Sequence, residues 1–303
     1  MSKPRFAVVG TGGVGGYFGA RLARAGFETT FLARGAHLAA IRRDGLRVVE
    51  PDGAFTVAAE ATDDPATIGP VDFALFAVKL WDTEAAAAQI RPLIGPDTAV
   101  VSLQNGVDSE PALAGILGGG HVMGGVAEIS SAITAPGTIT RFSPFQRIKA
   151  GELQPRDGAR LQRLAEACTA AGIAFQQPDD IQAAIWTKFT FLVGLSALTA
   201  LTRRPIGAVR SDPDTRALLR RVVDEAVAAG RAKGVVLPDD LTDRQMAFID
   251  SLPAEMRASM AMDLEKGQRL ELPWLSGAVV RMAGELGIDA SANAFVVAAL
   301  KLP

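Results

Sequence analysis

The sequence contains very few of the residues that most often crosslink a chain, bind metals or act as nucleophiles. Its 303 residues include one cysteine, Cys168, and two histidines, His37 and His121. A single cysteine excludes an intramolecular disulfide, and two isolated histidines without ligand spacing argue against a zinc site or a Ser-His-Asp triad. Cys168 falls on the apolar face of a predicted helix, so we interpret it as a small buried residue. No metal is therefore expected, and catalysis must use Lys, Glu, Asp, Asn, Ser or a cofactor.

The chain also lacks a strong charge of one sign and a long hydrophobic run. The formal net charge is −2, so no electrostatic field favours nucleic acid or an anionic membrane. The longest apolar run, Phe189 to Leu201, is too short to span a bilayer and predicts a buried helix. Arg5 leads directly into an apolar strand pattern, with no signal peptide before it. We therefore expect a cytoplasmic protein without nucleic-acid or membrane partners.

A glycine-rich turn stands near the start of the chain, between an apolar strand pattern at 5–10 and a helix pattern at 14–26. Gly10 permits a tight turn, Gly12 lets the backbone approach a pyrophosphate, and Gly15 lets the helix pack close to the strand. The start of the helix offers free N–H groups and a partial positive charge to phosphates. The pattern predicts that a dinucleotide is bound by Gly10, Thr11, Gly12, Gly13, Val14 and Gly15.

Strand and helix patterns alternate through the first half, which predicts a parallel, doubly wound sheet of the Rossmann type. The expected strands are 5–10, 28–33, 71–78 and 98–103, and the expected helices are 14–26, 35–44, 82–94 and 109–117. A turn at Pro51-Asp52-Gly53 predicts a hairpin of residues 46–49 and 54–58. Short strands around Ala135-Pro136-Gly137 predict an antiparallel extension, at 122–130, 132–134, 138–141 and 147–150. A helix at 161–171 and a strand at 173–176 complete this half.

Strand signals stop after Gln177-Pro178-Asp179-Asp180, where either aspartate is a natural helix N-cap. Helix patterns follow at 181–201, 212–233, 242–248, 255–265, 274–286 and 290–300. We predict an α/β protein with a dinucleotide-binding domain at residues 1–178 and an all-helical substrate and catalytic domain at residues 179–303.

The residue that ends the second strand selects the dinucleotide. An acidic residue there binds the ribose hydroxyls of NAD and repels the 2′-phosphate of NADP. This chain has Arg34 at that position, and a guanidinium can bind a phosphate with two hydrogen bonds. The expected cofactor is NADP(H).

Polar residues follow two buried strands, where ligands of doubly wound sheets bind. Lys79 follows the strand at 71–78 and is expected to contact a cofactor phosphate or carboxamide. Asn105 follows the strand at 98–103 and is expected to bind the nicotinamide ribose or the substrate. Both residues are therefore candidate cofactor contacts.

The second half contains a lysine inside an otherwise apolar helix, Lys188, which favours a functional ammonium over one that reaches to the surface. Further along, Ser259 and Asp263 are four residues apart and so lie on one helical face, ahead of Glu271. Lysine also fits the lack of a histidine to act as general acid.

These clusters together resemble the ketopantoate reductases (2-dehydropantoate 2-reductases), nearly from end to end. The motifs that carry the resemblance are the glycine turn with Arg34, Val78-Lys79, Gln104-Asn105-Gly106, Ala135-Pro136-Gly137, Trp186-x-Lys188, Ser259-Met260-x-x-Asp263 and Glu271. The resemblance implies that the first domain binds NADPH and that the helical domain closes over a branched 2-oxo acid. The reaction would reduce 2-dehydropantoate to pantoate, a step of pantothenate biosynthesis.

The resemblance also implies roles for individual residues. Lys188 would donate a proton to the substrate carbonyl, and Glu271 would position the substrate or that lysine. Ser259 would touch the substrate carboxylate, while Asn105 and Lys79 would line the nicotinamide end of the site.

The chain departs from the family pattern on the helix of the catalytic lysine. Family members carry asparagines four and eight residues after that lysine, where they bind polar groups of the substrate. Here the two positions are Leu192 and Ser196, so only Ser196 remains a candidate substrate contact. Two alternatives therefore stay open: the same chemistry on a more apolar 2-oxo acid or an opine-type substrate, and a dinucleotide-binding regulator without catalysis. A homodimer is left open as the assembly.

Overall fold

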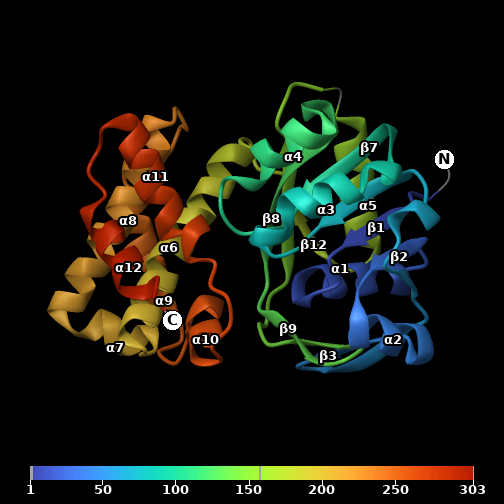
Figure 1. Ribbon diagram of the computed structural model, residues 1–303, viewed down its shortest axis with the longest axis horizontal. Coiled ribbons are helices and arrows are strands. Elements are labelled where there is room, and N and C mark those ends of the chain that lie inside the picture. The colour runs from blue at the N-terminus through green and yellow to red at the C-terminus, as the bar shows by residue number, and fades with distance from the viewer. Residues whose placement is uncertain (1–2, 157, 303) are drawn as a thin grey trace. The chain divides into compact units, whose positions relative to one another are not determined.

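The computed structural model describes residues 3–156 and 158–302 (Figure 1). The chain forms two compact units. The sheet unit comprises Met1–Gln104 and Asp108–Ile181, and the helical unit comprises Asn105–Val107 and Gln182–Pro303. The short piece Asn105–Val107 thus belongs to the helical unit although its neighbours in sequence on both sides belong to the sheet unit.

The sheet unit contains an eight-stranded sheet in the order β12-β11-β8-β7-β6-β1-β2-β5. In this order, each neighbouring pair from β8 to β5 is parallel. The pair of β8 and β11 is antiparallel, and the pair of β11 and β12 is parallel. The strands are β1 Phe6–Val9, β2 Thr29–Leu32, β5 Glu60–Thr62, β6 Val71–Phe76, β7 Ile94–Ser102, β8 Val122–Glu128, β11 Arg147–Glu152 and β12 Ala174–Gln176. The predicted doubly wound sheet is confirmed, with β7 and β6 side by side at its centre and β1 next to β6.

Both faces of this sheet are buried, because alternate residues of each strand point to opposite sides. On β1, Phe6 and Val8 join one buried cluster with residues of α1, α2 and α5, whereas Ala7 and Val9 join another with residues of α3 and α4. The helices are α1 Gly13–Arg24, α2 Gly35–Asp44, α3 Thr83–Gln89, α4 Ser109–Leu117 and α5 Ala159–Ala170.

A second sheet of four strands has the order β4-β3-β10-β9, with bounds β3 Leu46–Glu50, β4 Gly53–Val57, β9 Ser131–Ala135 and β10 Thr138–Arg141. The predicted hairpin of β3 and β4 is present. The strands expected to form one antiparallel extension are instead divided: β8 and β11 join the main sheet, while β9 and β10 join this second sheet through a parallel pair of β10 with β3. A side chain on Gly16 of α1 would meet Ile139, so a glycine there lets β10 lie against the helix.

Two helix boundaries differ from the sequence-based expectation: one helix ends earlier for a local reason, and another begins later because of a contact with a distant segment. The helix expected at 82–94 ends at Gln89, because Pro92 cannot donate a helical hydrogen bond, and β7 then begins at Ile94. The helix expected from residue 255 begins at Ser259. The carbonyls of Ala254 and Met256 accept hydrogen bonds from the first N–H groups of another helix, α7 Ile206–Ser211, which the sequence did not indicate.

All elements described after Gln176 are helical, as predicted. They are α6 Ile181–Thr202, α7, α8 Pro213–Ala232, α9 Leu241–Ser251, α10 Ser259–Glu265, a short 3-10 turn at Leu272–Trp274, α11 Ser276–Leu286 and α12 Ser291–Leu300. α6 is long and apolar enough to cross a membrane by composition, but 67% of its most apolar window is buried inside the structure. Phe189, Val193 and Ala197 of α6 lie in the core of the helical unit, which accounts for its apolar sequence.

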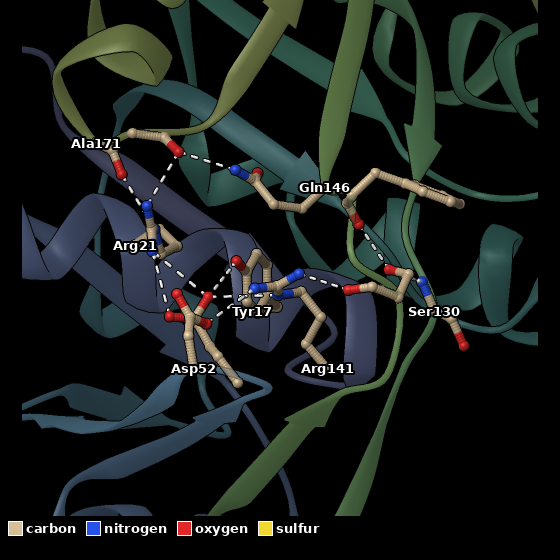
Figure 2. A network of polar contacts seen from close by, with 11 residues as sticks. Tyr17, Arg21, Asp52, Ser130, Arg141, Gln146 and Ala171 are labelled. Atoms are coloured by element: carbon tan, nitrogen blue, oxygen red, sulfur yellow. Dashed lines mark hydrogen bonds and ion pairs between the residues drawn. The ribbon is translucent and has the colours of Figure 1, made fainter.

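A buried ionic network joins α1 to the second sheet (Figure 2). The hydroxyl of Tyr17 donates to Glu50 Oε1 at 2.6 Å, and the guanidinium groups of Arg21 and Arg141 each lie 3.4 Å from a Glu50 oxygen. The side chains of Glu50 and Arg141 are only 10% and 9% exposed. Burial, together with the carboxylate that accepts its hydrogen bond, raises the pKa of Tyr17, so this tyrosine remains a donor to Glu50. One carboxylate is thus shared by two arginines from separate elements.

We predict that Glu50→Gln lowers the free energy of unfolding by about 3 kcal/mol, because it leaves two partly buried guanidinium groups without their shared anion. Urea unfolding of the purified protein would measure this. Asp52→Asn is the matched control: Asp52 lies 3.6 Å from the same Arg141, but its side chain is 83% exposed. The control should cost no more than about 0.5 kcal/mol. Equal effects of the two variants would contradict the role assigned to the buried network.

Candidate active site

The glycine-rich turn is shaped by close backbone contacts on one side and open space on the other. Gly10 has a φ of +92°, and a Cβ atom there would lie 2.8 Å from the backbone nitrogen of Val78. A Cβ atom on Gly15 would overlap the carbonyl oxygen of Gly10. A Cβ atom on Gly12, in contrast, would meet no atom within 4 Å. The turn therefore leaves its free surface at Gly12, which fits the close approach of a pyrophosphate.

The N–H groups at the start of α1 are suited to an anion. Gly12 is the N-cap, no side chain caps this helix end, and its first turn contains no acidic residue. The turn is fixed to the end of β2 by Thr11, whose backbone nitrogen and hydroxyl both donate to the carbonyl of Leu32, at 3.2 and 2.8 Å. A fixed helix start without a side-chain cap binds phosphate without first having to be ordered.

The two basic candidates of the sheet unit lie at exposed ends of elements. Arg34 is the N-cap of α2, and its Nη2 donates to Gln89 Oε1 at 3.0 Å. Lys79 lies three residues after the end of β6, and its ammonium lies 5.6 Å from the centre of the Trp81 ring. Both side chains belong to exposed residues, so each is accessible to a ligand. Their roles as cofactor contacts stay predictions.

Two further residues of this region, Gln104 and Thr83, were not selected from the sequence as site residues. Gln104, which is 8% exposed, donates through Nε2 to the carbonyl of Val78 at 3.0 Å and to the hydroxyl of Thr83 at 2.8 Å. Its Oε1 is buried without a hydrogen-bond partner. The sequence offered one signal, since Gln104 precedes Asn105 within the same polar cluster after β7.

Three of the predicted residues meet within the helical unit. Lys188 of α6 donates from Nζ to Asn105 Oδ1 at 2.9 Å, and Asn105 Nδ2 donates to Glu271 Oε2 at 3.3 Å. Glu271 is 5% exposed and precedes the 3-10 turn at Leu272–Trp274. The carboxamide of Asn105 therefore links the ammonium group to a buried carboxylate. Asn105 was predicted to bind cofactor and substrate, and the structure adds these two contacts to that expectation.

The other candidates for substrate contacts are less closely defined by the structure. Ser259 is the first residue of α10 and is exposed. On α6, Leu192 is half-buried one turn after Lys188, and Ser196 is 3% exposed two turns after it. Substrate binding by Ser259 and Ser196 therefore stays a prediction.

Cys168 and His37, which were not selected as catalysts, both have pKa values shifted by burial. Cys168 is 1% exposed, and burial raises the pKa of its thiol to about 12, so the reactive thiolate is disfavoured. Burial lowers the pKa of His37, whose Nδ1 accepts a hydrogen bond from the Gly137 nitrogen at 2.9 Å. Among residues 3–156 and 158–302, no three His, Cys, Asp or Glu side chains are grouped so that they could hold a metal ion.

Comparison with known protein families gives two consecutive matches that cover most of the chain. The family model described as ketopantoate reductase PanE/ApbA matches residues 6–155, and the model for the C-terminal part of the same family matches residues 180–303. A 2-dehydropantoate 2-reductase from Mesorhizobium japonicum is 32% identical over 296 residues, which cover 91% of this chain and 90% of the relative.

Solved structures agree with these matches. The PanE/ApbA family ketopantoate reductase of Ralstonia eutropha JMP134 superposes with a TM-score of 0.90 at 32% identity, covering 98% of this chain and 97% of that chain. A D-mandelate dehydrogenase solved with NADH and anilino(oxo)acetate also has a TM-score of 0.90, at 19% identity, with coverage of 98% and 97%. At that lower identity, the likeness shows a shared fold.

We predict that Gly12→Ala keeps the fold but blocks the dinucleotide. Its unfolding midpoint should stay within about 2 °C of the wild type, because the added methyl group meets open space. Dinucleotide affinity, measured by fluorescence titration, should fall at least about tenfold, because the methyl group occupies the surface where the pyrophosphate approaches. Gly15→Ala is the comparison variant and should destabilise the fold itself, since its Cβ atom would overlap a carbonyl. Unchanged affinity of Gly12→Ala would show that the turn is not the binding surface.

Proposed function

Since the chain belongs to the ketopantoate reductase family, an oxidoreductase family that acts on CH–OH groups, we propose that it reduces a 2-oxo acid to the 2-hydroxy acid with NADPH, and that 2-dehydropantoate is its first candidate substrate. The observation that carries this proposal is the contact set of Lys188, Asn105 and Glu271 in the helical unit. Together with the glycine turn of the sheet unit, it supplies the two requirements of the reaction: a place for a dinucleotide and a proton donor.

The chemistry divides between the cofactor and the protein. A bound nicotinamide supplies the hydride that reaches C2 of the oxo acid. The carbonyl oxygen then gains negative charge, which an ammonium group can attract and protonate. Lys188 fits this task because it is the ammonium of the set, it is half-buried, and it comes from a helix fixed in the core of its unit. In the proposal, one N–H of Lys188 passes its proton to that oxygen, which becomes the new hydroxyl.

Asn105 and Glu271 support the orientation of this ammonium. The oxygen of the Asn105 carboxamide accepts from Lys188, while its nitrogen donates to Glu271, so the carboxylate fixes which way the carboxamide faces. Glu271 also places a negative charge near the positive one, in a position with little access to water. We therefore assign Glu271 to positioning Lys188 through Asn105, with Ser259 as a substrate carboxylate contact.

Arg34 supports NADP(H) as the cofactor. Its guanidinium lies at the N-terminal end of α2 and makes an exposed contact with the amide of Gln89. A 2′-phosphate could replace this contact with stronger charge-assisted bonds. The family relationship establishes dinucleotide-dependent chemistry, and the preference for the phosphorylated form belongs to this proposal.

The substrate assignment has one specific competitor. Leu192 cannot hydrogen-bond a substrate hydroxyl, and Ser196 is shorter than the asparagine of the family pattern and nearly fully buried. A site without a partner for a hydroxyl discriminates weakly in favour of substrates that carry one. A more apolar 2-oxo acid or an opine-type precursor is therefore the second candidate. Family membership and the Lys188 contacts favour catalysis over a regulator that only binds dinucleotide. A cytoplasmic location, a homodimer and a place in pantothenate biosynthesis complete the proposal.

Arg34→Asp should reverse the cofactor preference or greatly reduce it. The wild type is expected to bind NADPH more tightly than NADH, and the variant replaces an attractive contact with repulsion of the 2′-phosphate. Fluorescence titration with both cofactors measures the ratio of affinities. Gln89→Ala is the control: it removes the amide that holds Arg34 but keeps the charge, so the preference for NADPH should survive. Equal wild-type affinities for the two cofactors would refute the assignment.

Lys188→Ala should lower turnover by about two to four orders of magnitude, the range expected when a charge-stabilising general acid is lost. The assay is NADPH oxidation with a panel of 2-oxo acids, ketopantoate first and apolar branched acids next. NADPH affinity should change little, since the glycine turn, Arg34 and Lys79 lie in the sheet unit. Lys233→Ala controls for the loss of a lysine from the helical unit, because Lys233 pairs with Glu285 on an exposed surface. No activity of the wild type with any 2-oxo acid, or full activity of Lys188→Ala, would overturn the proposal.

A further inference from the structure

Lys79 emerges from a loop that two buried polar side chains hold in place. We propose that Thr83 and Gln104 are positioning residues for Lys79, so that they set the affinity for the dinucleotide without touching it. This inference rests on the proposed dinucleotide binding by the sheet unit. It assigns a function to two residues that have no contact with Lys188 or Glu271 in the proposed chemistry.

The hydrogen bonds of Gln104 can be read in only one direction. The carbonyl of Val78 is an acceptor, so the atom of Gln104 that lies 3.0 Å from it must be the amide nitrogen. The same nitrogen lies 2.8 Å from the hydroxyl of Thr83. One amide group that follows β7 therefore binds the residue immediately before Lys79 and a residue four positions after it.

Thr83 closes the loop from its other end. Its hydroxyl donates to the carbonyl of Leu80 at 2.8 Å and so accepts the bond from Gln104. Thr83 is 6% exposed and Gln104 is 8% exposed, so water competes little for these bonds. The carbonyls on both sides of Lys79, those of Val78 and Leu80, are thereby fixed.

The opposite side of the loop is fixed by the glycine turn. The backbone nitrogen of Val78 is so close to Gly10 that a Cβ atom on Gly10 would lie 2.8 Å from it. The backbone before Lys79 is thus confined between the glycine turn and Gln104. Lys79 itself is exposed, and its Nζ lies over the ring of Trp81. The confined backbone fixes the point from which the Lys79 side chain starts, so the region that its ammonium can reach depends on this confinement.

The side-chain oxygen of Gln104 favours a functional explanation for this glutamine over a purely stabilising one. Its Oε1 is buried and has no hydrogen-bond partner among the residues that the structure describes, which costs stability compared with an apolar side chain of the same shape. Proteins retain such local costs most often where a site requires them. What this glutamine contributes in exchange is the pair of hydrogen bonds that it donates to Val78 and Thr83, which fix the loop of Lys79.

The experiment compares single and double variants by fluorescence titration with NADPH, with unfolding midpoints measured in parallel. Lys79→Met should weaken NADPH affinity about tenfold by removing a charge-assisted contact. Thr83→Val keeps the shape of the side chain but removes the hydroxyl, and it should weaken affinity about threefold to tenfold. Thr83→Ser keeps the hydroxyl and should restore affinity close to the wild type. Because Thr83 acts through Lys79, the double variant Lys79→Met/Thr83→Val should bind no more weakly than Lys79→Met alone.

Thr29→Val is the matched control. Thr29 is another buried threonine of the sheet unit, 7% exposed, whose hydroxyl donates to the carbonyl of Phe27 at the opposite end of the strands. It should shift the unfolding midpoint without changing NADPH affinity. If Thr83→Val does not fold, Gln104→Met tests the same loop and should give the same non-additive result with Lys79→Met.

The outcomes separate the two proposals. No effect of Lys79→Met on affinity would show that Lys79 does not contact the cofactor, which removes the contact on which this inference rests. A normal effect of Lys79→Met with no effect of Thr83→Val and Gln104→Met would leave dinucleotide binding intact and overturn the positioning role. Additive losses in the double variant would also overturn it, because Thr83 would then act on affinity by a route that does not include Lys79.

Discussion

The packing of the sheet unit depends on how closely its two sheets can approach α1. Glycines on two sides of this helix permit that close approach. Gly15 and Gly19, four residues apart, face the main sheet: Cβ atoms there would overlap the Gly10 carbonyl or come too close to Val8 and Phe31. Gly13 and Gly16 face the second sheet, where Cβ atoms would meet Ser131 and Ile139. α1 therefore packs closely against both sheets along its glycine positions. Gly12, the N-cap of the same helix, faces open space instead, which suits the approach of a phosphate.

The buried ions follow from this arrangement. Tyr17 and Arg21 are also four residues apart, and they form another face of α1 that meets Glu50. Arg141 reaches the same carboxylate from β10, and Arg21 donates in addition to the carbonyls of Ala171 and Gly172. A buried carboxylate between two arginines contributes little net energy but permits few alternative arrangements. It thus helps to specify the position of α1, the helix that carries the glycine turn.

The sequence was informative where structure depends on neighbouring residues and much less so where it depends on distant ones. The glycine turn, the alternation that gives the doubly wound sheet and the change to helices after Gln176 all follow local patterns. The division of the strands after Val122 between two sheets depends on the pairing of β10 with β3, about ninety residues earlier, which no local pattern reveals. The late start of α10 has the same origin, because the carbonyls of Ala254 and Met256 bind α7 instead of continuing a helix.

The candidate site shows this limit most clearly at Gln104 and Asn105. Both follow β7, and their place at the carboxyl end of a central strand was enough to select Asn105 as a site residue. The side chain of Gln104 binds Val78 and Thr83 in the sheet unit, whereas that of Asn105 binds Lys188 and Glu271 in the helical unit. Two consecutive residues therefore serve different units. An amide meets the requirement at both positions: each needs a donor, and at Asn105 an acceptor must also face an ammonium while the donor faces a carboxylate. A carboxylate at position 105 would lie beside Glu271 without a proton to donate, and an aliphatic side chain would leave Glu271 buried without this donor, so the chemistry of the neighbours accounts for asparagine at this position.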